Sequence, residues 1–105
     1  MLFRSAVMAT YRMIALMEIA AARLMIPLLK EGELSVGINL NVTHTAPTLV
    51  GNKIKVKATF LQMEGKLYSF EVEIIDDKGS AGKGTHTRAI VNNEKLLIGA
   101  AKRAS

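Results

Sequence analysis

The sequence predicts an α+β domain in which a curved antiparallel sheet packs around one long helix. Three observations support this prediction. Apolar residues follow a helical repeat over residues 10–29, they alternate with polar residues from residue 34 onward, and turn residues divide the alternating part into four segments. The 105 residues, half of them hydrophobic, are enough to form one core. We therefore expect residues 1–105 to form a single domain.

The expected helix runs from Thr10 to about Leu29 and contains an unusual acidic residue. Thr10 stands at a typical N-cap position, and Pro27 lies near the end. Every residue from 13 to 22 is apolar except Glu18, which is typical of a helix in a core. A carboxylate in such a place has to be paired, hydrogen-bonded or turned toward a cavity. Glu18 is therefore either a satisfied structural residue or a functional one.

The N-terminal segment gives no reason to expect export or membrane insertion. Residues 2–8 are a short apolar piece that suits a first strand. The following apolar run superficially resembles a signal peptide, but Arg12 and Glu18 interrupt it, and it is too short and too charged to span a bilayer. The absence of cysteine fits a reducing compartment. We therefore expect a cytoplasmic protein without a membrane partner.

The first alternating segment, residues 34–43, predicts a half-buried strand. Its apolar face carries Val36, Ile38, Leu40 and Val42, and its other face carries Ser35, Gly37, Asn39 and Asn41. His44 continues the apolar face. We therefore expect the His44 side chain to point toward the layer formed by the helix that carries Glu18.

The next two alternating segments, residues 53–63 and 67–76, predict a hairpin. A three-residue loop, Glu64-Gly65-Lys66, would pair Phe60 with Phe70 and would also align lysines with glutamates. Because apolar residues then face apolar residues and opposite charges face each other, the register agrees with the pattern.

The C-terminal part predicts one more strand, residues 80–91, and a short helix, residues 94–103, capped by Asn92 or Asn93. The four strands together are expected to form an antiparallel meander on one side of the long helix. A long apolar helix wrapped by a curved sheet is the plan of the hotdog fold.

Charge and composition limit the partners. The net charge of +5 suggests an anionic partner, such as nucleic acid, an acidic protein or coenzyme A. With five aromatic residues, no Trp and no arginine-rich run, we expect no nucleic-acid partner. The two histidines, His44 and His86, lack companion ligands at a metal-binding spacing, so we expect no metal site. Phosphate-loop and dinucleotide-binding motifs are absent from the sequence, so we expect no separate cofactor.

Several short motifs resemble those of the hotdog thioesterases of the fluoroacetyl-CoA thioesterase type. In order they are Ala9-Thr10, Met17-Glu18, Val36-Gly37, Val42-Thr43-His44, Val50-Gly51 and the run from Gly82 to Arg88 (GKGTHTR). The spacings of 8 residues from Thr10 to Glu18 (18−10) and 26 residues from Glu18 to His44 (44−18) also match the family.

This resemblance implies hydrolysis of a short or small acyl-CoA thioester at the interface of a homodimer, or of a higher oligomer, with coenzyme A as part of the substrate. The family's catalytic residues fall on Thr10, Glu18 and His44, and its substrate-binding glycine and arginine fall on Gly37 and Arg88. His86 shares a strand face with Arg88 and is a further candidate contact to the substrate.

Two features differ from the family pattern. Tyr11 replaces the proline that usually follows the catalytic threonine, and the lid aromatics of the N-terminal extension are reduced to Phe3. We therefore expect a family member whose acyl substrate is broader than, or different from, fluoroacetyl-CoA.

The residue types suit thioester hydrolysis, which needs a nucleophile or activated water, a base and donors for the oxyanion. Thr10 is either a nucleophile, a positioner of water or an ordinary N-cap, and Glu18 is a base or a nucleophile. His44 is a general acid–base or a structural residue. Thr10 and Glu18 lie about 80° apart around an ideal helix but two turns apart along it, so assembly of the site requires a loop or a dimer partner. The alternatives are a non-catalytic hotdog module that binds acyl-CoA and a purely structural homodimeric protein.

Overall fold

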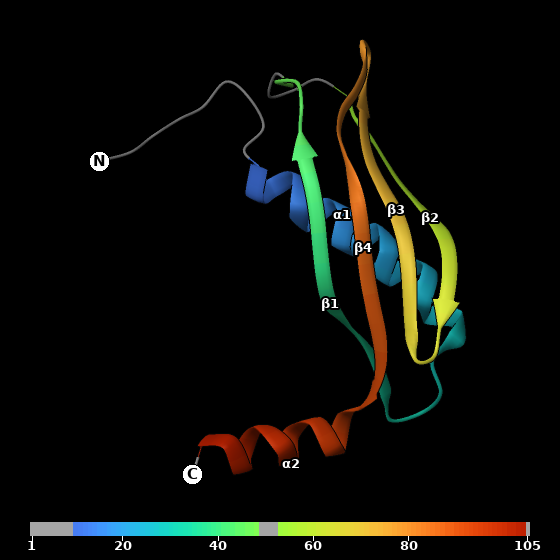
Figure 1. The fold of residues 1–105 in the computed structure, drawn as a ribbon, viewed down its shortest axis with the longest axis vertical. Coiled ribbons are helices and arrows are strands. Elements are labelled where there is room, and N and C mark those ends of the chain that lie inside the picture. Colours follow the sequence, from blue (N-terminus) through green and yellow to red (C-terminus); the bar gives the residue numbers. More distant parts are fainter. Residues whose placement is uncertain (1–9, 49–52, 105) are drawn as a thin grey trace.

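The computed structural model of the chain describes residues 10–48 and 53–104. The elements are α1 (Thr10–Met25), a 3-10 helix η1 (Ile26–Leu28), β1 (Glu33–His44), β2 (Lys55–Glu64), β3 (Leu67–Asp76), β4 (Gly79–Asn92) and α2 (Asn93–Ala104). Helix α1 crosses one face of the sheet, and α2 extends away from the end of β4 (Figure 1). The first strand expected at residues 2–8 lies outside the described residues.

The four strands form one antiparallel sheet in the order β1-β4-β3-β2. Strands β2, β3 and β4 follow one another as hairpins, as predicted. The prediction of a four-stranded meander is wrong for β1, because β1 pairs with β4 and not with β2. The connection from β1 therefore runs to the opposite edge of the sheet, and β1 and β2 are the two edge strands (Figure 1).

The core lies between α1 and the inner face of the sheet. One stripe of α1, repeating every four residues, is completely buried; it consists of Met13, Met17, Ala21 and Met25. The stripe packs on buried residues of the sheet, among them Phe70, Val72 and Ile74. Each such large side chain contributes about 1.5–3 kcal/mol by leaving water. The helix lies on the core as predicted, but it is not buried all round, since Ile19 and Leu24 are about half exposed.

The hairpin of β2 and β3 has the predicted register over most of its length. Phe60 pairs with Phe70, and their rings are in edge contact with centroids 5.9 Å apart. The loop is shorter than predicted, because the register shifts between Phe60 and Gln62 and the strands extend to Glu64 and Leu67. The shift therefore compensates for the shorter turn and preserves the pairing of the aromatic rings.

A second irregularity in β1 decides which residues face α1. The register shifts between Gly37 and Asn39, so that Ile38 is an extra residue and is 55% exposed. After the shift the apolar face is the predicted one, and Leu40 and Val42 pack on the core. In the part of β1 that precedes the shift, the residues predicted to face α1 face away from it, and the other residues face α1. Gly37, and not Ile38, is therefore turned toward α1. The alternation of apolar residues does not reveal this bulge.

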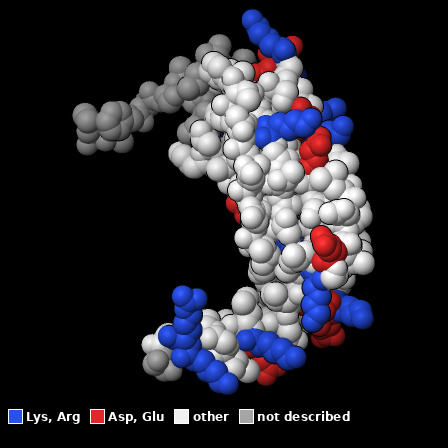
Figure 2. Space-filling model, viewed as in Figure 1, with Lys and Arg blue, Asp and Glu red and all other residues white. Residues whose placement is uncertain are grey.

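The C-terminal helix begins as predicted. Asn92 Oδ1 accepts a hydrogen bond of 3.0 Å from the Lys95 amide, which is an N-cap interaction. The part of α2 that the structure describes contains no buried residue, and basic side chains gather over it (Figure 2). No helix within residues 10–48 and 53–104 is long and apolar enough to cross a membrane.

Candidate active site

Thr10 and His44 lie next to each other, although they are 34 residues apart in the sequence. Thr10 opens α1 and His44 ends β1, and Thr10 Oγ1 lies 3.0 Å from His44 Nδ1. The other ring nitrogen, His44 Nε2, is buried and has no hydrogen-bond partner among the described residues. Buried polar atoms are nearly always partnered in folded proteins. The His44 ring is therefore oriented on one side by Thr10 and available on the other.

Glu18 belongs to a second cluster, around Gly37. A Cβ atom at Gly37 would lie 3.4 Å from Glu18 Oε2, 3.1 Å from His86 Cε1 and 3.6 Å from Arg88 Nη1. Side chains from α1 and from β4 thus converge on a position of β1 that has no side chain of its own. The bulge after Gly37 turns this residue toward them, and glycine permits the close approach.

Arg88 is the most firmly held residue of this second cluster. Its side chain is 7% exposed, and Nε and Nη2 each donate a hydrogen bond of 3.1 Å, to Ser35 Oγ and to the Ser35 carbonyl oxygen. Nη1 donates to His86 Nε2 at 3.0 Å. Burial lowers the pKa of Arg88, and the nearby carboxylate of Glu18 opposes that change. The guanidinium remains charged at any physiological pH. The cluster therefore contains a buried cation near a carboxylate.

Within this chain the two clusters are separate. Thr10 and Glu18 are eight residues apart on α1, which corresponds to about 12 Å along the axis. Gly37 and His44 are seven residues apart on β1, which corresponds to roughly 20 Å. His44 does face α1, as predicted, but at the Thr10 end of the helix. The structure thus pairs Thr10 with His44 and groups Glu18 with Gly37, His86 and Arg88.

Two residues of the second cluster were not found from the sequence. Ser35 receives two hydrogen bonds from Arg88, and the carbonyl oxygen of Asn39 lies 2.9 Å from His86 Nδ1. The alternation of β1 predicts both on the face opposite the apolar residues. Ser35 can be identified from the sequence only if the pairing of β1 with β4 is already known, since this pairing places Ser35 near Arg88.

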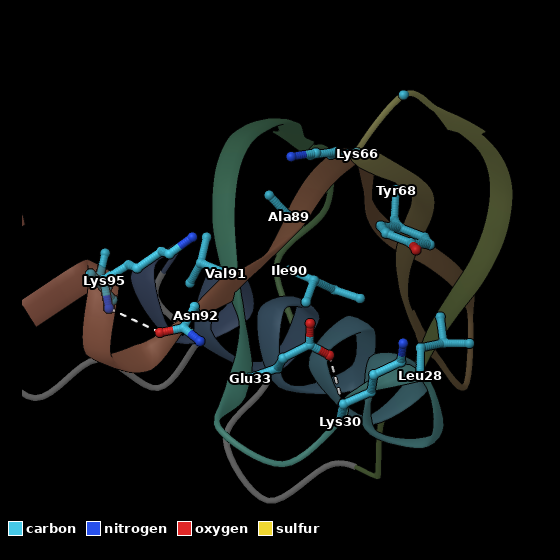
Figure 3. Close-up of a pocket in the computed structure, with 12 residues that line it drawn as sticks. Leu28, Lys30, Glu33, Lys66, Tyr68, Ala89, Ile90, Val91, Asn92 and Lys95 are labelled. Atoms are coloured by element: carbon cyan, nitrogen blue, oxygen red, sulfur yellow. Dashed lines mark hydrogen bonds between the residues drawn. The ribbon is translucent and has the colours of Figure 1, made fainter.

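A cavity of about 790 Å³ lies beside the C-terminal part of β4 (Figure 3). It lies between the chain that follows α1, the hairpin of β2 and β3, and the start of α2. Tyr68, which pairs with Arg88, contributes to its lining. Three lysines from these three regions surround it, namely Lys30, Lys66 and Lys95. The carboxylate of Glu33, also in the lining, accepts a hydrogen bond of 2.7 Å from the Lys30 amide.

The architecture defines the class of protein. The chain superposes on a hot-dog-like protein from Thermanaerovibrio acidaminovorans with a TM-score of 0.91 and 24% identity, over 95% of this chain and 74% of that one. This similarity shows the hotdog fold and confirms the predicted fold class.

The family follows from the sequence match. A family model described as fluoroacetyl-CoA-specific thioesterase matches residues 3–94. The chain belongs to this family, and the resemblance drawn from the motifs is confirmed. The fluoroacetyl-CoA thioesterase of Streptantibioticus cattleyicolor is 43% identical over 90 residues, which are 86% of this chain and 65% of the relative. The chain thus spans slightly less than two thirds of that relative's length.

A solved structure extends this similarity to a ligand-bound enzyme. A point mutant of the fluoroacetyl-CoA-specific thioesterase, in complex with fluoroacetate and CoA, superposes on the chain with a TM-score of 0.87. The identity is 38%, and the match covers 94% of this chain and 77% of that one.

Proposed function

We propose that the protein hydrolyses a small acyl-CoA thioester to the carboxylic acid and free coenzyme A. The observation that carries this proposal is the buried Nε2 of His44, which has no hydrogen-bond partner in the described part of the chain, on a ring that Thr10 orients through Nδ1. A histidine held in this way is suited to general acid–base catalysis. The activity named for the matching family and for the relative supports the same reaction.

We propose further that each site combines the two clusters from two protomers of a homodimer. Strand β1 is an edge strand, and an open edge favours pairing with another chain. In an antiparallel pairing of two β1 strands about a two-fold axis, the half that ends at His44 lies beside the partner half that contains Gly37. This arrangement shortens the separation between His44 and a Glu18 carboxylate, which is large within one protomer.

In this scheme each group has one task. The Glu18 carboxylate removes a proton from a water molecule, whose oxygen adds to the thioester carbonyl carbon. The negative charge that develops on the carbonyl oxygen is stabilised by the N–H groups of Arg88 that Ser35 and His86 leave free. The C–S bond then breaks, and the departing thiolate takes a proton from His44. The proton that Glu18 took from water then passes to His44, which restores both groups.

The phosphates of coenzyme A are proposed to bind in the cavity surrounded by Lys30, Lys66 and Lys95. Tyr68 lines the cavity and pairs with Arg88 across β3 and β4. We therefore propose that an extended substrate reaches from the lysines to the second cluster. The three positive charges suit an anionic group. The one carboxylate of the described lining, that of Glu33, is already hydrogen-bonded to the main chain.

A panel of acyl-CoA thioesters with detection of the released thiol tests the function. Wild-type protein is expected to hydrolyse short acyl chains fastest, and Glu18→Ala and His44→Ala are expected to lower kcat by at least about 100-fold while the thermal unfolding temperature changes little. Tight binding of a non-hydrolysable acyl-CoA without any turnover would instead identify a non-catalytic binding module. Turnover that is unchanged in both variants would refute the residue assignment.

A further inference from the structure

His86 is 2% exposed, and both nitrogens of its ring have protein partners. Nδ1 lies 2.9 Å from the carbonyl oxygen of Asn39, and Nε2 lies 3.0 Å from Arg88 Nη1. A carbonyl oxygen only accepts hydrogen bonds, and a guanidinium only donates them. The proton must therefore be on Nδ1, and Nε2 must present its lone pair to Arg88. The two bonds together fix a single, neutral tautomer.

We propose that His86 is a positioning residue that acts through Arg88. Its Nε2 accepts one of the two Nη1–H groups, while Ser35 accepts from Nε and from Nη2. These three bonds leave one N–H on each terminal nitrogen of Arg88. They also hold Nη1 3.6 Å from the point where a Cβ of Gly37 would lie, on the side where Glu18 approaches. His86 thereby directs the free N–H groups toward the reacting carbonyl.

The surroundings of His86 support a fixed neutral ring. The charged groups near it are Arg88, on its own strand, and Glu18 from α1. Strand β1 contributes the Asn39 carbonyl, and β3 places Phe70 directly opposite. A proton on Nε2 would remove the acceptor that Arg88 uses and leave a buried N–H without a partner, which is costly.

Two substitutions to residues with amide side chains test the two hydrogen bonds of His86 one at a time. In His86→Gln the amide oxygen reaches the position of Nε2, so it can still accept from Arg88. In His86→Asn the shorter amide reaches only the position of Nδ1, so the bond to Asn39 is kept and the bond to Arg88 is lost. We expect kcat/KM within about 3-fold of wild type for His86→Gln and a loss of about 10- to 100-fold for His86→Asn, mainly in kcat. In an Arg88→Met background the two variants should be equal. Equal kcat/KM for His86→Gln and His86→Asn in a protein that retains Arg88 would contradict the proposal.

The kinetic part of this inference rests on the proposed thioesterase activity, so a second measurement is independent of turnover. Nitrogen-15 NMR of the full chain near neutral pH should show His86 with a protonated Nδ1 and an unprotonated Nε2. A proton on Nε2, alone or together with one on Nδ1, would overturn the proposal even if the enzyme is active. The expected tautomer in a protein that hydrolyses no acyl-CoA would support the placement of Arg88 and refute the proposed function.

Discussion

Gly37 pairs with Arg88 across β1 and β4, beside the β1 bulge, and the space that a side chain would occupy at Gly37 is bordered by Glu18, His86 and Arg88. This relationship explains why a carboxylate is tolerated on the inner face of α1. Glu18 lies near a buried guanidinium and at a gap in the side chains of the neighbouring strand. The absence of a Cβ thus opens the space in which we propose that the thioester carbonyl binds.

Substitution of Gly37 tests this relationship. In Gly37→Ala the new Cβ would lie 3.1 Å from His86 Cε1, so the ring and its neighbours would have to shift by a few tenths of an ångström. We expect kcat/KM to fall by at least about tenfold and the free energy of unfolding to fall by about 1–3 kcal/mol, as for other overpacked sites.

Gly99→Ala is the matched control, because nothing lies within 4 Å of the corresponding position in α2. This variant should retain full activity, and its unfolding free energy should stay equal or rise by up to about 1 kcal/mol. Full activity in Gly37→Ala would show that the space at Gly37 is not used by the substrate.

The lysines of the cavity in Figure 3 should affect only substrates that carry the nucleotide phosphates. Replacement of Lys30, Lys66 and Lys95 by Ala together is expected to raise KM for an acyl-CoA by about tenfold, because each exposed charge pair is worth roughly 0.2–1 kcal/mol. KM for the matching acyl-pantetheine, which lacks the nucleotide, should stay unchanged.

Lys57→Ala provides the control, since Lys57 lies on β2 opposite Glu73 and outside the lining of this cavity. It should leave KM for both substrates unchanged. An equal rise in KM for acyl-CoA and acyl-pantetheine in the triple variant would place the phosphates elsewhere.

Asp76 makes the stability of the fold depend on pH in the acid range. Hydrogen bonds from the Lys78 amide and from the Thr48 hydroxyl, of 2.8 and 3.0 Å, lower the pKa of the Asp76 carboxyl in the folded protein. The unfolded chain has the ordinary pKa near 3.9. The stabilisation is therefore fully present above about pH 4 and is lost as the pH falls through the lowered folded-state pKa.

Thermal unfolding of wild type and Asp76→Asn between about pH 2.5 and pH 6 checks this sign. Wild type should unfold at the higher temperature at pH 6, and the difference should shrink below about pH 4. A difference between wild type and Asp76→Asn that is constant over the whole range would contradict the assignment.

Most of the fold could be predicted because local pattern and global packing agree in this chain. The strand at Leu67–Asp76 has the predicted bounds, and the pairing of Phe60 with Phe70 follows from alternation on two strands joined by a short turn. The pairing of β1 with β4 could not be predicted in this way. It depends on contacts between residues far apart in the sequence, which alternation does not encode.

The candidate site was predictable in its residues but not in its grouping. Glu18 is conspicuous because it interrupts an apolar helix, and His44 because it continues an apolar face. The bulge at Ile38, however, reverses which residues of β1 face α1, and only in the part of the strand before Ile38. It therefore turns Gly37 toward Glu18, a contact that strict alternation excluded. The roles of Thr10, Glu18 and His44 in catalysis stay predictions.

Complementation between two inactive variants tests the central claim most directly. Glu18→Gln and His44→Gln proteins are mixed, unfolded and refolded together so that protomers exchange. If each site takes its Glu18 from one protomer and its His44 from the other, half of the dimers are mixed and each mixed dimer contains one intact site. Acyl-CoA hydrolysis should then recover to about one quarter of the wild-type rate. A mixture that stays as inactive as the separate variants, although mixed dimers are present, would contradict a site shared between two protomers.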